Sequence, residues 1–360
     1  MCFLSLCMIV KNEEADLSRC LDSVKGLVDE IIIVDTGSLD LTKEICSLYG
    51  AKRYDYQWED NFAMARNYSV SLATGEWILW MDADEVLVHG AKEDLIKVLK
   101  DSESSVFAVK MLHLCETENI QDKNYYISYN HRLFRSRKEL TFEGAIHEKL
   151  MIDKEVIVEE SNMLEIIHYG YLRQYKDRKS NRNLDIVLKE LNAGKEDPWL
   201  FYYLASELYY YGDCEKALQS INLSILRFLS KGIMAPALLY RLKYEILQQS
   251  EQLESTESGL RMVIEQYPDY VDLHYLRGVT LYQMNQYDDS IKEFYYCLML
   301  GENNVNYLIK AGSGTFSALY YTGKCYLKLG KIEYAREAFK QSLLYYPNYS
   351  LAMEMLNEIG

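Results

Sequence analysis

The periodicity of the chain changes near its middle, and this change limits the folds that the chain can adopt. In the first half, short apolar runs alternate with stretches whose apolar residues recur at helical spacing. In the second half, from about Leu184, only the helical spacing remains, and it recurs in a longer repeat. A chain of 360 residues also exceeds one ordinary core. We therefore expect two domains of different classes.

The first half has the pattern of alternating strands and helices. We expect strands at residues 3–10, 30–34, 51–54 and 76–81, and helices at residues 15–25, 40–49 and 61–73. This alternation predicts a mostly parallel, doubly wound sheet. Ligands of such sheets bind beyond the carboxyl ends of the strands. Polar clusters follow Val10, Val34 and Met81, so three strand ends converge on one candidate site.

The second half carries a helical repeat. From Ser317 to Pro347, small and aromatic residues stand at the offsets of a tetratricopeptide repeat, namely Gly323, Tyr326, Ala335, Phe339 and Ser342. The pattern fits three earlier segments as well, and Tyr244 and Gly278, which share one offset, are 34 residues apart. Small residues let the paired helices approach, and aromatic residues fill the gaps between them. The pattern predicts an all-α repeat domain in which most tyrosines pack between helices.

Charge and composition exclude several classes of function. The formal net charge is −15, which argues against broad binding to nucleic-acid phosphates, so we expect no nucleic-acid partner. The apolar opening at residues 1–10 lacks the basic start and the cleavage site of a signal peptide. No later stretch has the roughly 20 uninterrupted apolar residues that cross a bilayer. We therefore expect a cytoplasmic protein without a transmembrane segment.

The sharpest local motif is the pair of carboxylates in Asp82-Ala83-Asp84. The motif follows the apolar run at residues 75–81, so a buried strand brings it to the edge of the sheet. Two carboxylates there can reach a hard divalent cation that bridges a diphosphate. Asp-x-Asp is common in proteins, and a solvated turn is the structural alternative.

The motifs of the first half together resemble those of family 2 glycosyltransferases with the GT-A fold. The matching segments are residues 8–14, 33–38, 60–67 and 82–85. With the repeats that follow, the whole chain is similar to the bacterial peptide glycosyltransferases that modify bacteriocin precursors. The resemblance implies a Rossmann-like α/β GT-A domain over residues 1–175. It implies an all-α tetratricopeptide-repeat domain over residues 176–360, for acceptor binding or assembly.

The resemblance also implies which residues bind the nucleotide-sugar donor. Glu13 and Asp35 would hydrogen-bond the base and ribose of a uridine-type nucleotide, and Arg66 would meet the nucleotide and its diphosphate. The remaining donor-site candidates are Val10, Gly37, Asp82 and Ala83. The alternatives are a helix cap for Asp35 and a surface ion pair for Arg66.

The same resemblance implies a metal site and a catalytic base. Asp84 would ligate Mn²⁺ or Mg²⁺, with Asp82 close to the ribose and the metal. His168 is our further ligand, because neutral imidazole commonly binds such ions, and a core histidine is the alternative. Transfer by direct displacement needs a base to take the acceptor proton. Glu148 is the preferred base, and His147 could serve instead or orient it.

These features predict a metal-dependent, inverting hexosyltransferase that moves a sugar from a UDP-sugar to a peptide or protein side chain, either Cys or Ser/Thr. The repeats would hold this acceptor on a concave surface. One alternative is a transferase whose acceptor is a cell-surface glycan or a lipid-linked sugar. Another is a non-catalytic repeat scaffold. The sequence leaves open the sugar, the linkage atom and the oligomeric state, a homodimer included.

Overall fold

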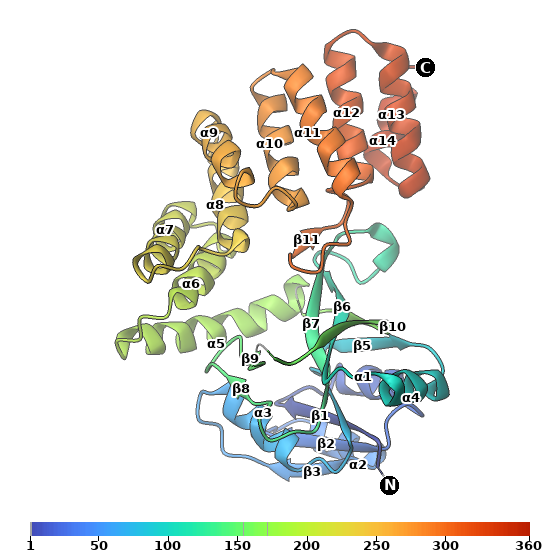
Figure 1. The fold of residues 1–360 in the computed structure, drawn as a ribbon, viewed down its shortest axis with the longest axis vertical. Helices are drawn as coiled ribbons and strands as arrows, with labels where there is room; N and C mark the ends of the chain where they lie inside the picture. The colour runs from blue at the N-terminus through green and yellow to red at the C-terminus, as the bar shows by residue number, and fades with distance from the viewer. Residues whose placement is uncertain (1, 154, 171) are drawn as a thin grey trace. The chain divides into compact units, whose positions relative to one another are not determined.

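The computed structural model describes residues 2–153, 155–170 and 172–360 (Figure 1). The chain divides into two compact units. The first comprises Met1–Glu116 and Ser128–Lys179, and the second comprises Thr117–Ile127 and Ser180–Gly360. In the sequence, the segment 117–127 of the second unit thus lies between two parts of the first unit, and it includes the first residues of a strand that continues into the first unit. The division predicted from the sequence, at residue 175, instead treats each domain as one continuous segment.

The first unit is built on a sheet with the strand order β3-β2-β1-β4-β7-β6-β10-β5. Its strands are β1 Leu4–Val10, β2 Glu30–Asp35, β3 Lys52–Asp55, β4 Trp77–Trp80, β5 Glu85–His89, β6 Val106–Leu114, β7 Tyr125–Arg135 and β10 Val158–His168. The strands β3, β2, β1 and β4 are parallel neighbours, as predicted. In contrast, β7 runs antiparallel to β4, and β5 runs antiparallel to β10.

The sheet is therefore mixed, and the connections explain why. Parallel neighbours need a long crossover, usually a helix, whereas antiparallel neighbours can be joined by a short loop. The helices of the first unit are α1 Leu17–Ser23, α2 Thr42–Leu48, α3 Phe62–Ser71 and α4 Lys92–Asp101. Between α4 and α5 the chain has no α-helix within the described residues, and it passes through β6, β7, the short strands β8 Phe142–Glu143 and β9 Lys149–Leu150, and β10. The parallel half of the sheet carries the strand ends at which the site was predicted.

The second unit consists mainly of paired helices. They are α6 Pro198–Tyr210, α7 Cys214–Ser230, α8 Ala237–Gln249, α9 Leu253–Ile264, α10 Val271–Gln283, α11 Tyr287–Leu300, α12 Phe316–Lys328, α13 Ile332–Tyr345 and α14 Ser350–Glu358. The predicted packing of small against aromatic residues is confirmed at two glycines. A Cβ at Gly278 would come within 2.7 Å of the Phe294 ring, and one at Gly323 would collide with Phe339.

The helical region begins earlier than the sequence predicted. Helix α5 spans Arg173–Asn192, whereas the expected start was about Leu184. Residues 173–183 are almost all polar, so they lack the apolar periodicity on which the prediction rested. Strand β11, Ile309–Lys310, pairs with Tyr126 and Ile127 inside the second unit. None of the helices described by the structure is long and apolar enough to span a bilayer.

Candidate functional site

The loops that follow β1 and β2 are tied to each other at the edge of the sheet. The Asn12 backbone N–H donates to Ser38 Oγ at 3.0 Å, and Asn12 Oδ1 accepts from the Leu39 backbone N–H at 2.8 Å. The Glu13 backbone N–H donates to Thr42 Oγ1 at 2.8 Å. Asn12 has a positive φ of 55°, which asparagine tolerates better than most residues. These bonds bring the predicted donor residues of the two strand ends to one place, with Val10 buried beneath them.

Asp35 ends β2 and is 1% exposed. Its Oδ1 accepts from the backbone N–H groups of Gly37 at 3.0 Å and Ser38 at 2.8 Å, so it caps a turn rather than a helix. Gly37 has a φ of 107°, which this turn requires and glycine tolerates. Asp35 Oδ2 is buried and accepts no hydrogen bond from the described residues, and Arg53 Nη1 lies 3.7 Å away. A buried carboxylate oxygen that accepts no hydrogen bond from the described residues is suited to accept one from a ligand.

Arg66, on α3, joins two of the predicted site carboxylates. Its Nε donates to Glu148 Oε1 at 2.8 Å, and its Nη2 donates to Asp82 Oδ1 at 3.1 Å. The guanidinium carbon lies 3.9 Å from the centroid of the Trp80 ring. Burial alone would lower the pKa of Arg66, but the two carboxylates outweigh burial and raise it. Because Arg66 is only 2% exposed, this ion pair is not the surface pair that was the alternative.

The loop that carries Glu148 is docked on α3. The Asn67 side chain donates to the Phe142 carbonyl at 2.9 Å and accepts from the Phe142 N–H at 2.7 Å. The backbone N–H of Phe62, at the start of α3, donates to the Ala145 carbonyl at 2.9 Å. The loop thus satisfies a helix N–H group that lacks a partner within the helix. Glu148 enters the cluster around Arg66, whereas its neighbour His147, with a φ of 50°, is exposed to solvent.

A buried ion pair between Glu85 and Arg132 lies next to the Asp82-Ala83-Asp84 motif and stabilises its backbone. Glu85 is fully buried, and its Oε1 lies 2.6 Å from Arg132 Nη2. Its Oε2 accepts from the Asp82 backbone N–H at 2.9 Å. Burial raises the pKa of Glu85, and Arg132 opposes that shift. Glu85 therefore holds the backbone of the motif, while Ala83 is buried and Asp82 remains one-third exposed at its side chain.

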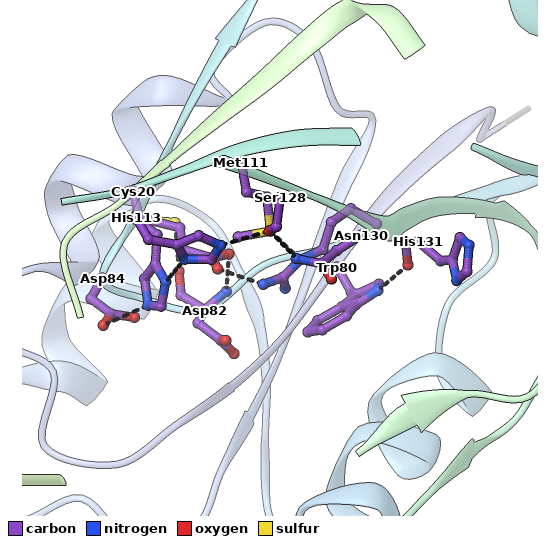
Figure 2. A network of polar contacts seen from close by, with 12 residues as sticks. Cys20, Trp80, Asp82, Asp84, Met111, His113, Ser128, Asn130 and His131 are labelled. Atoms are coloured by element: carbon purple, nitrogen blue, oxygen red, sulfur yellow. Dashed lines mark hydrogen bonds and ion pairs between the residues drawn. The ribbon is translucent and has the colours of Figure 1, made fainter. Parts of the chain in front are cut away.

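Asp84 lies at one end of a chain of polar contacts, and Figure 2 labels it together with two other members of the chain, His113 and Ser128. Asp84 Oδ2 is 3.4 Å from His168 Nε2, and His168 Nδ1 is 2.9 Å from His113 Nδ1. The Nε2 atom of His113 in turn lies 2.7 Å from Ser128 Oγ. Burial, with His168 nearby, holds the pKa of His113 well below its usual value, so His113 is neutral. His113 was not predicted from the sequence, although a histidine near the end of an apolar strand run could have pointed to it.

Two of the predicted metal ligands, Asp84 and His168, fit a divalent cation. Two ligands that each lie about 2.1 Å from one ion are about 3 Å apart at octahedral angles, close to the separation seen. A Cβ at Gly170 would collide with both Asp84 Oδ2 and His168 Nε2, so the glycine keeps this space open. The third predicted ligand, Asp82, is instead bound to Arg66. Within the described ranges no group of three or more His, Cys, Asp or Glu side chains could hold a metal.

Comparison with known proteins finds a family match in each half of the chain. Residues 5–157 match glycosyl transferase family 2, and residues 316–349 match the tetratricopeptide repeat. The chain is similar to a TPR repeat-containing protein of Synechococcus elongatus, with 34% identity over 279 residues that cover 73% of this chain and 64% of the relative. It is also similar to the SPbeta prophage-derived glycosyltransferase SunS of Bacillus subtilis, with 29% identity over 289 residues, or 76% of this chain and 65% of the relative.

The aligned part of the chain spans just under two thirds of the length of these two relatives. An uncharacterized glycosyltransferase of Rickettsia felis is 29% identical over 160 residues, which are 42% of this chain and 56% of that relative. The family match includes Asp35, Arg66 and Asp84. The chain therefore carries a family 2 glycosyltransferase domain in its first half and a tetratricopeptide repeat near its C-terminus.

Proposed function

We propose that this chain is a metal-dependent, inverting glycosyltransferase that moves a sugar from a UDP-sugar to a side chain of a peptide or protein. The observation that carries the proposal is Asp35 Oδ2, a buried acceptor at the end of β2, in the same unit as Arg66 and the Asp82-Ala83-Asp84 motif. The family match supports the class of reaction. Intact-mass spectrometry of peptides encoded near its gene, after incubation with a panel of nucleotide sugars and Mn²⁺, tests the proposal directly.

The turn at Asp35 favours uridine over guanosine. Because Oδ1 is engaged by Gly37 and Ser38, only Oδ2 remains to accept a hydrogen bond from a base. The uracil ring offers one N–H between two carbonyl groups, whereas the guanine edge offers two adjacent N–H donors. One acceptor oxygen can satisfy the single N–H of uracil. The same oxygen would leave one of the two guanine donors without a partner, which is costly in a buried site. Glu13, at the neighbouring strand end, would contact the nucleotide as well.

We expect Asp35→Asn to weaken UDP binding by about 10-fold or more, because a hydrogen bond to a charged group contributes about 1.5–3 kcal/mol. Calorimetry with UDP and with GDP in the presence of Mn²⁺ measures the effect and the base preference together. Asp101→Asn, at an exposed position at the end of α4, is the matched control. Unchanged UDP affinity in Asp35→Asn, or tighter binding of GDP by the unaltered protein, would contradict this assignment.

We assign the role of the base to Glu148 and the binding of the diphosphate to Arg66. All of the Glu148 contacts to Arg66 go to Oε1, which leaves Oε2 to take the proton of the acceptor. The acceptor atom then attacks the anomeric carbon of the sugar while the bond from that carbon to the diphosphate breaks. Arg66 Nη1 makes no hydrogen bond to the described residues, and the guanidinium fork suits phosphate oxygens. A divalent cation held by Asp84 and His168, with Asp82 nearby, would neutralise the leaving diphosphate.

The repeats supply a surface for the acceptor. Within the second unit, side chains of α6, α8, α10 and α12 line an open groove of about 470 Å³, among them Tyr209, Gln249, Tyr275, Gln283 and Tyr321. Tyrosine offers a large ring with a polar tip at little entropic cost, which suits contact with a peptide. Amide side chains can pair with the backbone of an extended peptide through both a donor and an acceptor. This groove is the part of the repeats that we assign to the acceptor.

We expect the double substitution Gln249→Ala and Gln283→Ala to raise the KM for a full-length acceptor by roughly 10-fold, since each lost hydrogen bond costs about 0.5–1.5 kcal/mol. Slow hydrolysis of the donor by water should not change. Both glutamines are exposed, so the fold should tolerate their loss. Gln219→Ala, at an exposed position on α7, is the control. An unchanged KM would indicate that the repeats serve stability or assembly instead.

A further inference from the structure

His113 contacts the proposed metal ligand His168 through the Nδ1 atoms of both rings, which are 2.9 Å apart. The two rings meet edge to face, at an interplanar angle of 73°. A neutral imidazole carries one N–H donor and one acceptor nitrogen. When both rings are neutral, one of the two Nδ1 atoms therefore carries the proton of this hydrogen bond and the other carries a lone pair.

The two possible arrangements present different groups to Asp84. If His168 Nδ1 donates, His168 Nε2 turns a lone pair toward Asp84, and His113 Nε2 donates its own proton to Ser128 Oγ. If His113 Nδ1 donates, His168 Nε2 points an N–H group at Asp84, and the Ser128 hydroxyl donates to His113. Both arrangements contain the same number of protons. Only the first leaves His168 Nε2 able to bind a cation, because a metal binds a nitrogen lone pair.

One distance favours the first arrangement. The 3.4 Å between Asp84 Oδ2 and His168 Nε2 exceeds the range of about 2.7–3.2 Å for an N–H···O hydrogen bond. Gly170 leaves open the space beside both atoms, which a Cβ would fill. Ser128 Oγ accepts from Asn130 Nδ2 at 3.1 Å and lies 2.7 Å from His113 Nε2, a contact that either arrangement can form.

We infer that His113 is a positioning residue for the divalent cation, because it accepts the Nδ1 proton of His168 and so turns the Nε2 lone pair of His168 toward the ion. Ser128 completes the arrangement by accepting from His113 Nε2. The hydrogen-bond partner of a metal-bound histidine commonly fixes both its tautomer and its orientation. The inference rests on the proposed metal-dependent function, and its tests separate the two.

The first test reads the tautomers directly. The full chain is labelled with ¹⁵N-histidine, and long-range ¹H–¹⁵N spectra are recorded with saturating Mg²⁺, which is diamagnetic. We expect the signals of His168 to show a protonated Nδ1 and an unprotonated Nε2, and those of His113 to show the reverse. His168→Gln and His113→Gln assign the signals. The opposite tautomers would overturn the inference, whatever the protein does with a donor.

The second test is Mn²⁺ affinity by calorimetry. We expect His113→Phe to weaken Mn²⁺ binding by about 10- to 100-fold, as loss of such partners does elsewhere. His113→Asn keeps an acceptor near the position of Nδ1 and should retain most of the affinity, and His89→Phe, at an exposed histidine at the end of β5, is the control.

The outcomes distinguish the inference from the function on which it rests. Absence of Mn²⁺ binding by the unaltered protein would overturn the metal site and the inference together. Binding that His168→Ala weakens but His113→Phe does not would overturn the inference and leave the metal site in place. If His113→Phe fails to fold, the spectra of the unaltered protein decide.

Discussion

Replacing Asp84 with Asn should lower sugar transfer by about 10³-fold, because a bound cation contributes several kcal/mol to the stabilisation of the developing charge. Asn retains the size of the side chain beside His168 and Gly170, and the backbone bond from the Tyr169 N–H to the Asp84 carbonyl at 3.0 Å is not altered. The fold should therefore survive. The measurement is the initial rate of transfer to a peptide acceptor at saturating Mn²⁺, together with the Mn²⁺ dissociation constant.

The variant also separates loss of the cation from loss of the donor. UDP should still bind Asp84→Asn in the absence of metal, because Asp35 and Arg66 are intact. Asp101→Asn again serves as the control for an Asp-to-Asn change on the surface. Normal transfer by Asp84→Asn would show that the metal assignment is wrong, and donor hydrolysis absent even from the unaltered protein would favour the scaffold alternative.

Replacing Glu148 with Gln should lower transfer by about 10²- to 10⁴-fold, the usual contribution of a general base. Gln keeps a carbonyl oxygen for the Arg66 N–H groups and a side chain of the same shape, so UDP binding should persist. Glu143→Gln, at an exposed position in the same loop, is the matched control. Transfer is followed by mass spectrometry, and UDP affinity by calorimetry.

The size of the rate loss in Glu148→Gln also indicates whether the sugar is attached to sulfur or to oxygen. A thiol, with a pKa of about 8.5, is partly ionised near neutral pH, whereas a Ser or Thr hydroxyl is not. A Cys acceptor should therefore lose less rate in Glu148→Gln than a Ser acceptor in the same peptide. Equal rates for Glu148→Gln and the unaltered enzyme would move the role of base to His147 or to another group.

Local patterns in the sequence were sufficient to predict the elements that precede the site. The apolar runs before Val10, Asp35 and Asp82 form parallel strands, and α3 forms within the predicted range. Such patterns depend on residues a few positions apart, so the sequence carries them directly. The small and aromatic residues of the last repeat also pack as predicted, because their spacing follows helix geometry.

Contacts between segments that are distant in the sequence could not be predicted from local patterns. The segment Thr117–Ile127 follows β6 and includes the first residues of β7, yet it belongs to the second unit, where Lys123 Nζ donates to the Tyr345 carbonyl at 2.9 Å. The pairing of Arg66 with Glu148 joins positions 82 residues apart. Both contacts depend on where loops lie in the folded chain, and the composition of a loop does not predict its position.

The register of two strands decided the rest of the site. The sequence by itself determined that histidine is scarce and that His168 lies in a candidate motif. It did not determine which residue His168 contacts. In the structure β10 lies parallel to β6 with His168 opposite His113, and the register of this pair shifts between Ser161 and Glu165. Across this shift β10 advances four residues while β6 advances one, and such an odd offset moves every later side chain to the other face of the sheet. Only the tertiary structure, through this irregularity in β10, places His113 beside His168.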